Sequence, residues 1–250
     1  MSFAEKHPER FFECGIAEQD MVSMAGGLAL SGMLPVVHSF SCFLSTRPNE
    51  QIYNNATEHT KIVYVGGLSG VLPAGPGHSH QSVREISAVG GVPNLVMAAP
   101  SCPAEVGALL DWCLDTHDGP SFLRMASLPA EIDWDIPSGW RPTPGQGFEI
   151  AAGGDAVLIG SGPILLAQAV KASRALAEKG VGLQVVNLPW LNRVDAQWIA
   201  GLAKGKRLVV TLDDHYLDGG TSERPRFRVG IETPERASAA ITFSPWPPSR

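Results

Sequence analysis

The chain has 250 residues, of which 44% are hydrophobic, and its formal net charge at pH 7 is −6. This length allows one large domain or two of ordinary size, and the apolar content is sufficient for a folded core. The acidic balance and the lack of a Lys/Arg cluster argue against nucleic acid or an anionic membrane as a partner. The N-terminal MSFAEKHPERFF has no apolar signal core, and no apolar run reaches the ~20 residues of a membrane span, so a cytoplasmic protein is expected.

The first half of the chain alternates apolar strands with helical patterns. The Met, Val, Ala and Gly residues after Glu18 predict a helix. Strands are predicted at 32–40, 61–67, 93–101 and 119–126, and helices at 47–60, 82–92 and 102–116. Residues 68–81 contain too much Gly, Pro and Ser for regular structure and are predicted to form a loop. Such alternation predicts an α/β fold with a parallel sheet covered by helices on both faces.

The second half repeats the alternation on a smaller scale. Residues 128–150, rich in Pro, Trp and Asp, are predicted to form a linker between a first domain at 1–127 and a second at 151–220. Strands are predicted at 155–162, 181–194 and 206–215, and helices at 163–180 and 195–205. Little regular structure is expected in the tail, 221–250.

The four cysteines show no CxxC spacing and no histidine cluster at zinc-site intervals. So few cysteines in a chain of this length are typical of a reduced, intracellular protein. We expect all four to be free thiols in or near the core: Cys14, Cys42, Cys102 and Cys113. We also expect that this chain alone binds no metal ion.

Two glycine-containing turns weakly suggest phosphate binding. Gly154-Asp155-Ala156, with Asn187 about thirty residues on, lacks the third glycine that close backbone approach to a phosphate requires. Gly160-Ser-Gly162 lacks the third glycine of a dinucleotide-binding loop. An ordinary turn leading into a strand or a helix explains both better.

Three polar clusters are stronger candidates. Asp213, Asp214 and His215 follow a predicted strand, where they could form an acid/base or metal set, or simply a polar strand end. His78 and His80 lie in the Gly-Pro loop, where a solvated loop and a substrate contact are both open. Glu18, in GIAEQD, is either an ordinary first-turn glutamate or a functional carboxylate that pays a desolvation cost among apolar neighbours.

A family resemblance decides among these readings. Pyrimidine-binding domains of transketolases, and more distantly those of deoxyxylulose-phosphate synthases, are similar to FFECGIAEQDMVSMAGGLALSGMLPVVHSFSCFLSTRPNEQI. Later stretches resemble the same family in the same order: GPGHSHQSVREISAVGGVPNLVMAAPSCPAEV, GPSFLRM, GDAVLIGSGPILLAQAVKASRALAEKGVGLQVVNLPWLNRVD and LDDHYLDGG. The resemblance covers roughly residues 3–220. It implies a pyrimidine-binding domain, a smaller transketolase C-terminal domain and thiamine diphosphate as cofactor.

The resemblance also implies roles for single residues. Glu18 would contact N1′ of the cofactor's aminopyrimidine and share a proton with it, and Phe43 would stack on the same ring. Phe40 and Arg47 would lie nearby. The histidine of the substrate-contacting loop would be His80, with His78 as an extra neighbour. An arginine that binds the phosphate of the substrate would be Arg124, whose fork of donors suits that task.

Departures from the family pattern suggest a split enzyme. The glycine-aspartate-glycine motif that holds Mg²⁺ and the diphosphate is missing from the 250 residues. We therefore expect an N-terminal transketolase subunit to supply that half of the site, in an assembly of two plus two chains. The family usually has one more strand and helix before FAEKHPERFF, and its closing helix and strand are not recognisable after Gly220.

Three functions remain open at this point. The first is one subunit of a transketolase that moves a two-carbon ketol unit between sugar phosphates, in central or specialised metabolism such as natural product biosynthesis. The second is a β subunit of a 2-oxoacid dehydrogenase, which shares the architecture but has no use for a sugar-phosphate arginine. The third is a non-catalytic scaffold, which would not need Glu18, Phe43, His80 and Arg124 together.

Overall fold

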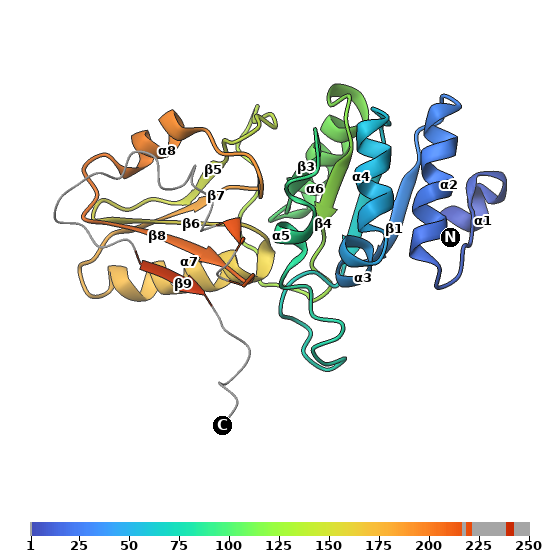
Figure 1. The fold of residues 1–250 in the computed structure, drawn as a ribbon. Helices are drawn as coiled ribbons and strands as arrows, with labels where there is room; N and C mark the ends of the chain where they lie inside the picture. Colours follow the sequence, from blue (N-terminus) through green and yellow to red (C-terminus); the bar gives the residue numbers. More distant parts are fainter. Residues whose placement is uncertain (1, 217–218, 222–238, 243–250) are drawn as a thin grey trace.

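The computed structural model describes residues 2–216, 219–221 and 239–242 (Figure 1). These residues form two sheets, one with the strand order β1-β2-β4-β3 and one with the order β5-β7-β6-β8-β9. Helices pack against both sheets, and the predicted α/β fold with a parallel first sheet is confirmed. No helix in the described part of the chain has the length and apolar character needed to cross a membrane.

The first sheet is wholly parallel, and its strands end together. Its members are β1 (Val36–Phe40), β2 (Val63–Gly67), β4 (Ser121–Arg124) and β3 (Val96–Ala98). Phe40 pairs with Gly67, and Gly66 pairs with Arg124, so the carboxyl ends of β1, β2 and β4 meet at one edge. In parallel α/β sheets this edge is where ligands bind.

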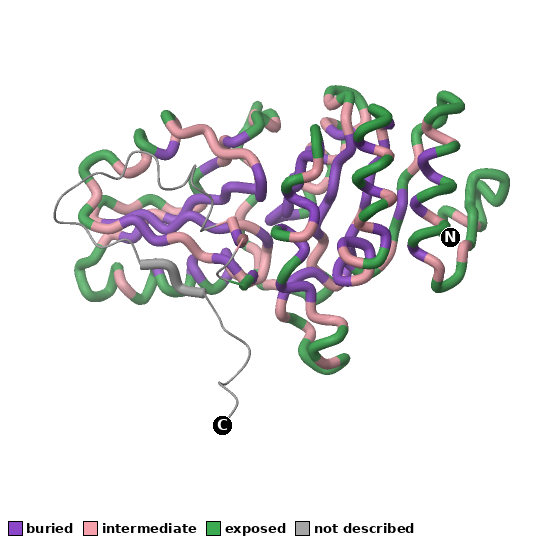
Figure 2. Tube along the Cα trace, viewed as in Figure 1, coloured by how far each residue is buried: buried purple, intermediate pink, exposed green. Residues whose placement is uncertain are grey.

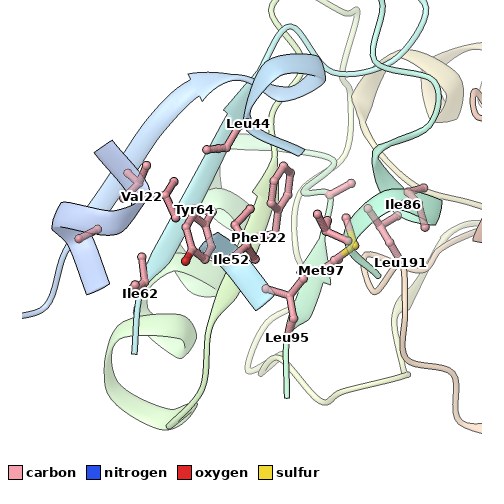
Figure 3. Close-up of a cluster of buried hydrophobic side chains, with 14 residues drawn as sticks. Val22, Leu44, Ile52, Ile62, Tyr64, Ile86, Leu95, Met97, Phe122 and Leu191 are labelled. Atoms are coloured by element: carbon pink, nitrogen blue, oxygen red, sulfur yellow. The ribbon is translucent and has the colours of Figure 1, made fainter. Parts of the chain in front are cut away.

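The first unit contains several helices and short turns, of which the two nearest the N-terminus bury no residue. They are α1 (Phe3–Lys6), a 3₁₀ turn (Pro8–Arg10), α2 (Glu18–Leu30), α3 (Ser41–Thr46), α4 (Asn49–Thr57), α5 (Glu85–Val89) and α6 (Pro103–Asp111). The chain continues from α6 into a π-helical turn, Trp112–Thr116. Buried side chains from α2, α3, α4, α5 and the strands form one core cluster, in which Tyr64, Phe122 and Met97 are completely buried (Figure 3). This packing of apolar faces is the main source of the domain's stability.

The second sheet is mixed. Its strands are β5 (Phe148–Ala151), β6 (Ala156–Gly160), β7 (Leu183–Asn187), β8 (Leu208–Asp213) and β9 (Ala239–Thr242), with α7 (Pro163–Ala177) and α8 (Ala196–Ala203). Four of these strands are parallel, whereas β5 runs antiparallel to β7. The helix α7 begins with Pro163 at its first position, where the missing N–H costs nothing.

Two strands lie where the sequence predicted none. Strand β5 begins inside the predicted linker, where Gly147 allows the backbone to approach the Asn187 carbonyl so closely that an added Cβ would overlap it. Strand β9 lies in the tail that was expected to have little regular structure, and it pairs with β8. Both strands arise from pairing with a distant strand rather than from a local pattern. The remainder of the tail, 222–238 and 243–250, lies outside the described residues.

The two sheets share one core. Val96 and Leu109 of the first unit belong to the same buried cluster as Val157, Val186 and Ile199 of the second. The segment that follows β7 also runs along the free edge of β3. Ala99 N donates to Pro189 O at 2.8 Å and Leu191 N donates to Met97 O at 2.9 Å.

The side chain of Asn192 strengthens the same contact. It accepts from Met97 N at 2.9 Å and donates to Leu95 O at 2.8 Å and to Gly90 O at 3.2 Å. These three bonds tie the second unit to the main chain of the first. All four cysteines are free, as predicted, with Cys14 half-buried and the other three buried.

Candidate active site

Four elements meet at the carboxyl edge of the first sheet. Phe40 is the last residue of β1, and α3 starts directly after it, so Phe43 stands in the first turn of α3. The long loop between β2 and α5 carries His80 and extends below α3 and α5 in Figure 1. Glu18 is the first residue of α2. Residues far apart in sequence therefore converge at the edge that favours ligands.

Five of the predicted site residues form one connected group. Arg47 Nη1 donates to Glu18 Oε1 at 2.7 Å and to Oε2 at 2.9 Å. The Arg47 guanidinium carbon lies 3.8 Å from the centroid of the Phe43 ring. The centroids of the Phe43 and His80 rings are 5.1 Å apart, and the Phe40 ring centroid lies 6.1 Å from each of those two. We call this group, Glu18, Phe40, Phe43, Arg47 and His80, the ring cluster.

Glu18 is buried at the start of its helix. It is 6% exposed, although the preceding Ile16 is 90% exposed. The turn before it needs Gly15, which has φ +64° and so adopts a backbone conformation that other residues rarely take. Glu18 also stands in the first turn of α2, where the helix dipole favours a negative charge. Local structure and the contact with Arg47 thus hold this carboxylate in a nearly dry place.

The small residues of α2 have a structural purpose in this chain. At Gly26 an added Cβ would overlap Asn55 Oδ1, because α2 and α4 approach closely there. Asn55 Nδ2 donates to Val22 O at 2.9 Å and joins the two helices. Gly27, by contrast, has nothing within 4 Å of an added Cβ.

The two loop histidines differ in their surroundings. His80 is half-buried against the Phe43 ring, and its Nδ1 lies 3.0 Å from Ser79 Oγ. His78 is exposed. The imidazole of His80 is therefore the better placed of the two.

Arg124 lies at the same edge but outside the ring cluster. It is 7% exposed, and it donates from Nε to Glu85 Oε1 at 2.5 Å and from Nη2 to Asp214 Oδ1 at 2.6 Å. Burial lowers its pKa, but the carboxylates of Asp214 and Glu85 outweigh burial and raise the pKa above the ordinary value. The sequence did not single out Glu85, because a glutamate in a predicted helix gives no sign of a buried arginine 39 positions away.

The polar residues after β8 hold the two units together. Asp214 binds Arg124, and Asp213 Oδ2 accepts from Thr221 N at 2.8 Å. His215 is 1% exposed, with Nε2 3.3 Å from Ser87 N and Nδ1 2.8 Å from Tyr216 O. Burial raises the pKa of Asp213. These contacts favour the polar strand end over an acid/base set.

The metal site and the diphosphate turn considered in the sequence are not built among the described residues. No group of three or more metal-ligating side chains is assembled among the described residues. Asp155 Oδ2 accepts from Gly182 N at 2.7 Å, and Asn187 Nδ2 donates to Glu105 Oε1 at 2.7 Å. The turn around Asp155 is thus an ordinary structural turn.

Two family models match the chain. One, described as the transketolase pyrimidine-binding domain, matches residues 1–127, and the other, described as the transketolase C-terminal domain, matches residues 145–224. A curated 1-deoxy-D-xylulose-5-phosphate synthase of Prochlorococcus marinus is 33% identical over 214 residues, which are 85% of this chain and 33% of the relative. The synthase of Mycolicibacterium vanbaalenii is 35% identical over 223 residues, which are 88% of this chain and 34% of the relative. The chain spans about a third of the length of these relatives.

Two solved structures share the fold. One is titled "Split gene transketolase, inactive beta4 tetramer", with a TM-score of 0.83 and 25% identity, and the match covers 96% of this chain and 77% of that chain. The other is a transketolase from Leishmania mexicana, with a TM-score of 0.66 and 20% identity, covering 80% of this chain and 30% of that chain. The second likeness supports the fold alone.

Proposed function

Since this chain belongs to the transketolase family of thiamine-diphosphate enzymes, we propose that it is one subunit of an enzyme that transfers a two-carbon ketol unit between sugars. Membership confirms the resemblance that GIAEQ, PVVHSFSCFL and GHSHQ indicated. The observation that carries the proposal is the ring cluster, because it places a buried carboxylate, an aromatic face and an imidazole at the ligand edge of a parallel sheet.

The ring cluster fits the aminopyrimidine of thiamine diphosphate. The planar guanidinium of Arg47 lies over the Phe43 ring while it donates to both oxygens of Glu18. A flat, nitrogen-bearing group can therefore stack on Phe43 and bind the Glu18 carboxylate at the same time. Arg47 is 39% exposed at its side chain, so it is free to reach solvent when another group takes this place.

Three residues of the ring cluster then have definite tasks. Glu18 holds or shares a proton with a ring nitrogen of the bound pyrimidine, in a site that excludes water. Phe43 orients the ring, and His80 offers a donor or an acceptor to a substrate hydroxyl. When bound, thiamine diphosphate supplies an acidic thiazolium carbon that serves as nucleophile and electron sink.

We further propose that a partner subunit holds the diphosphate and Mg²⁺ and that the assembly contains two copies of each chain. The similarity to a split-gene transketolase supports this proposal. So does an apolar surface. Of the fifteen large hydrophobic side chains that are exposed in the described residues, ten lie within the first 40 residues, around α1, α2 and β1. Much of the trace of α1 and α2 is exposed in Figure 2. An exposed apolar surface of this kind marks a protein interface. The free thiols fit the proposed cytoplasmic location.

A native mass spectrum tests the proposal. The tagged chain would be purified from its own host with thiamine diphosphate and Mg²⁺ present. We expect a complex of two copies of this chain and two copies of a partner, with the cofactor retained. A partner that carries the glycine-aspartate-glycine motif would support the split arrangement. A bare monomer or homodimer that binds no thiamine diphosphate would overturn it.

A second candidate is the reaction named for the curated relatives, which are 33% and 35% identical to this chain and are 1-deoxy-D-xylulose-5-phosphate synthases. The purified complex distinguishes the two candidates by product. Formation of 1-deoxy-D-xylulose 5-phosphate would identify the synthase reaction, and a lengthened sugar acceptor would identify ketol transfer.

A further inference from the structure

Arg124 is enclosed by carboxylates that come from both units of the chain. Glu85, the first residue of α5, accepts from Nε, and Asp214, just after β8, accepts from Nη2. Glu85 is completely buried and Arg124 is 7% exposed. Two of the nitrogen atoms of the guanidinium thus already donate hydrogen bonds to carboxylates, in a place with little access to water.

The local charge is already negative. Glu85 and Asp214 both accept hydrogen bonds from the one Arg124 guanidinium, so two carboxylates face a single cation. A phosphate ester would add about 1.5 to 2 negative charges at neutral pH. Repulsion between charges is weakly screened in a buried site. A phosphate at Arg124 would therefore be repelled by more carboxylate charge than the one guanidinium can neutralise.

The space beside Arg124 is also small. Arg124, Asp214, Ser69 and Ser161 line a pocket of about 20 Å³ between the two units. This volume is close to the minimum of ~10–15 Å³ that one water molecule needs, and it leaves no room for a phosphate. The loop after β2 closes the site further, because an added Cβ at Gly70 would overlap Asp214 Oδ2.

The ion pairs also support the loop that carries His80. Gly70 and Ser82 exchange two backbone hydrogen bonds of 3.0 Å, which close the base of this loop directly on the Asp214–Arg124 pair. Tyr216 N donates to Val83 O at 2.8 Å beside it. Any loss of Arg124 would therefore disturb His80 whatever substrate is present.

We infer that Arg124 is a positioning residue that fixes the His80 loop and the second unit, and that the sugar which reaches this edge carries no phosphate at the end facing Arg124. This inference rests on the proposed ketol transfer and replaces the phosphate-binding role predicted for Arg124. The substrate class that fits is an unphosphorylated polyhydroxy ketone or aldehyde, whose hydroxyls bind without adding charge.

The test compares a five-carbon ketose with its 5-phosphate ester as donors for the assembled complex. Arg124→Met is expected to lower kcat/KM for both donors by the same factor, so that their ratio changes by less than about 3-fold. The result that would overturn the inference is a selective loss with the phosphate ester of about 10- to 150-fold, the value of one charge-assisted bond. Arg193→Met is the matched control, because Arg193 of the second unit donates to Leu95 O of the first at 3.0 Å.

A second variant covers the case in which Arg124→Met does not fold. Asp214→Asn removes one negative charge, and it is expected to improve the relative kcat/KM for the ester by at least about 4-fold, the value of a unit charge ~5 Å away in water. No improvement would count against the inference.

A binding measurement separates this inference from the proposed function. If neither donor reacts, the proposed ketol transfer is wrong. The role of Arg124 is then tested by thermal unfolding of the full chain with inorganic phosphate as probe. A concentration of 10 mM is roughly ten times a weak millimolar Kd. We expect no shift in Tm for the unsubstituted chain, because the pocket beside Arg124 is too small for phosphate. A shift in the unsubstituted chain that disappears in Arg124→Met would overturn the inference.

Discussion

Glu18 shows how a single side chain can be held ready for a proton. Its two oxygens accept from one guanidinium, and its helix begins at the same residue. Both interactions fix the position of the carboxylate in the site. A carboxylate held in this way can receive a hydrogen bond from a ring nitrogen as soon as Arg47 gives way.

Glu18→Gln is expected to lower kcat of the assembled complex by roughly 10²- to 10⁴-fold, because an amide cannot share a proton with the pyrimidine. Steady-state turnover with saturating thiamine diphosphate measures the effect. Glu50→Gln is the control, since Glu50 is exposed in the first turn of α4. Activity within about 3-fold of the parent for Glu18→Gln would favour the scaffold reading over the enzyme.

The sequence predicted the members of the ring cluster but not their geometry. Glu18, Phe43 and His80 stand in motifs that resemble the family, so they could be named from one sequence. The bidentate contact of Arg47 with Glu18 could not be foreseen, because it joins residues 29 positions apart through the fold. The same holds for Glu85, whose partner Arg124 becomes its neighbour only when α5 packs beside β4.

At the scale of elements, the contact between α2 and α4 depends on one glycine. Gly26→Ala is expected to destabilise the chain by about 1–3 kcal/mol, because the new methyl would displace Asn55 and break its bond to Val22 O. Gly27→Ala in the same helix is the matched control and should stabilise by about 0.5–1 kcal/mol, since nothing crowds that position. Urea unfolding of both variants measures the difference. Equal effects of the two substitutions would show that α2 and α4 do not pack this closely.

Predictability also varied from element to element. Strands β2 and β6 were found because buried parallel strands read as continuous apolar runs. Helix α3 was missed, because six residues that directly follow a strand leave too little periodicity to detect. Strand β5 was assigned to a linker, since its partner β7 lies more than thirty residues further along the chain.

At the scale of the whole molecule, a buried carboxyl joins the two sheets. Glu105 of α6 is completely buried. Its Oε2 accepts from Ser101 N at 2.6 Å and from Ser101 Oγ at 2.7 Å, and its Oε1 accepts from Asn187 of β7. Burial raises the pKa of Glu105, and the hydrogen bonds from Ser101 and Asn187 oppose that rise without cancelling it. Because Glu105 bonds to residues of both units, its protonation makes the stability of their contact depend on pH.

The folded chain binds the Glu105 proton more tightly than the unfolded chain does. Its contribution to the free energy of unfolding is therefore largest at low pH and declines as pH rises from about 4.5, the ordinary value, through the raised pKa. Glu105→Gln is expected to remove this part of the slope. Asn187 Oδ1, which has no hydrogen-bond partner among the described residues, can accept from the new amide after the Asn187 side chain turns over.

Urea unfolding across pH 4 to 8, a range of about four units that begins near the ordinary carboxyl pKa and extends above it, measures that slope. Asp213, whose pKa burial also raises, contributes equally to the parent and the variant, so the difference isolates Glu105. The exposed Glu178→Gln is the control. An unchanged slope in Glu105→Gln would show that Glu105 has the same proton affinity in the folded and unfolded chains.

The apolar surface of the first 40 residues gives a prediction for assembly. Met33 is 58% exposed, and Met33→Lys is expected to weaken binding of the partner by at least about 10-fold, because a charge would have to be desolvated in the interface. Val181→Lys, at a residue that is 37% exposed in the second unit, is the matched control. Titration of the partner, followed by native mass spectrometry, measures both. Equal affinities for the two variants would place the interface elsewhere.

The contact between the segment after β7 and the edge of β3 has a consequence for biosynthesis. A ribosome makes β3 and β4 first, and the residues that cover the β3 edge, up to Asn192, emerge about 70 residues after Arg124. At ~5–20 residues per second, the nascent first sheet waits roughly 3–14 s with an open edge. Unpaired edges attract other strands, so this interval is when the growing chain most needs a chaperone.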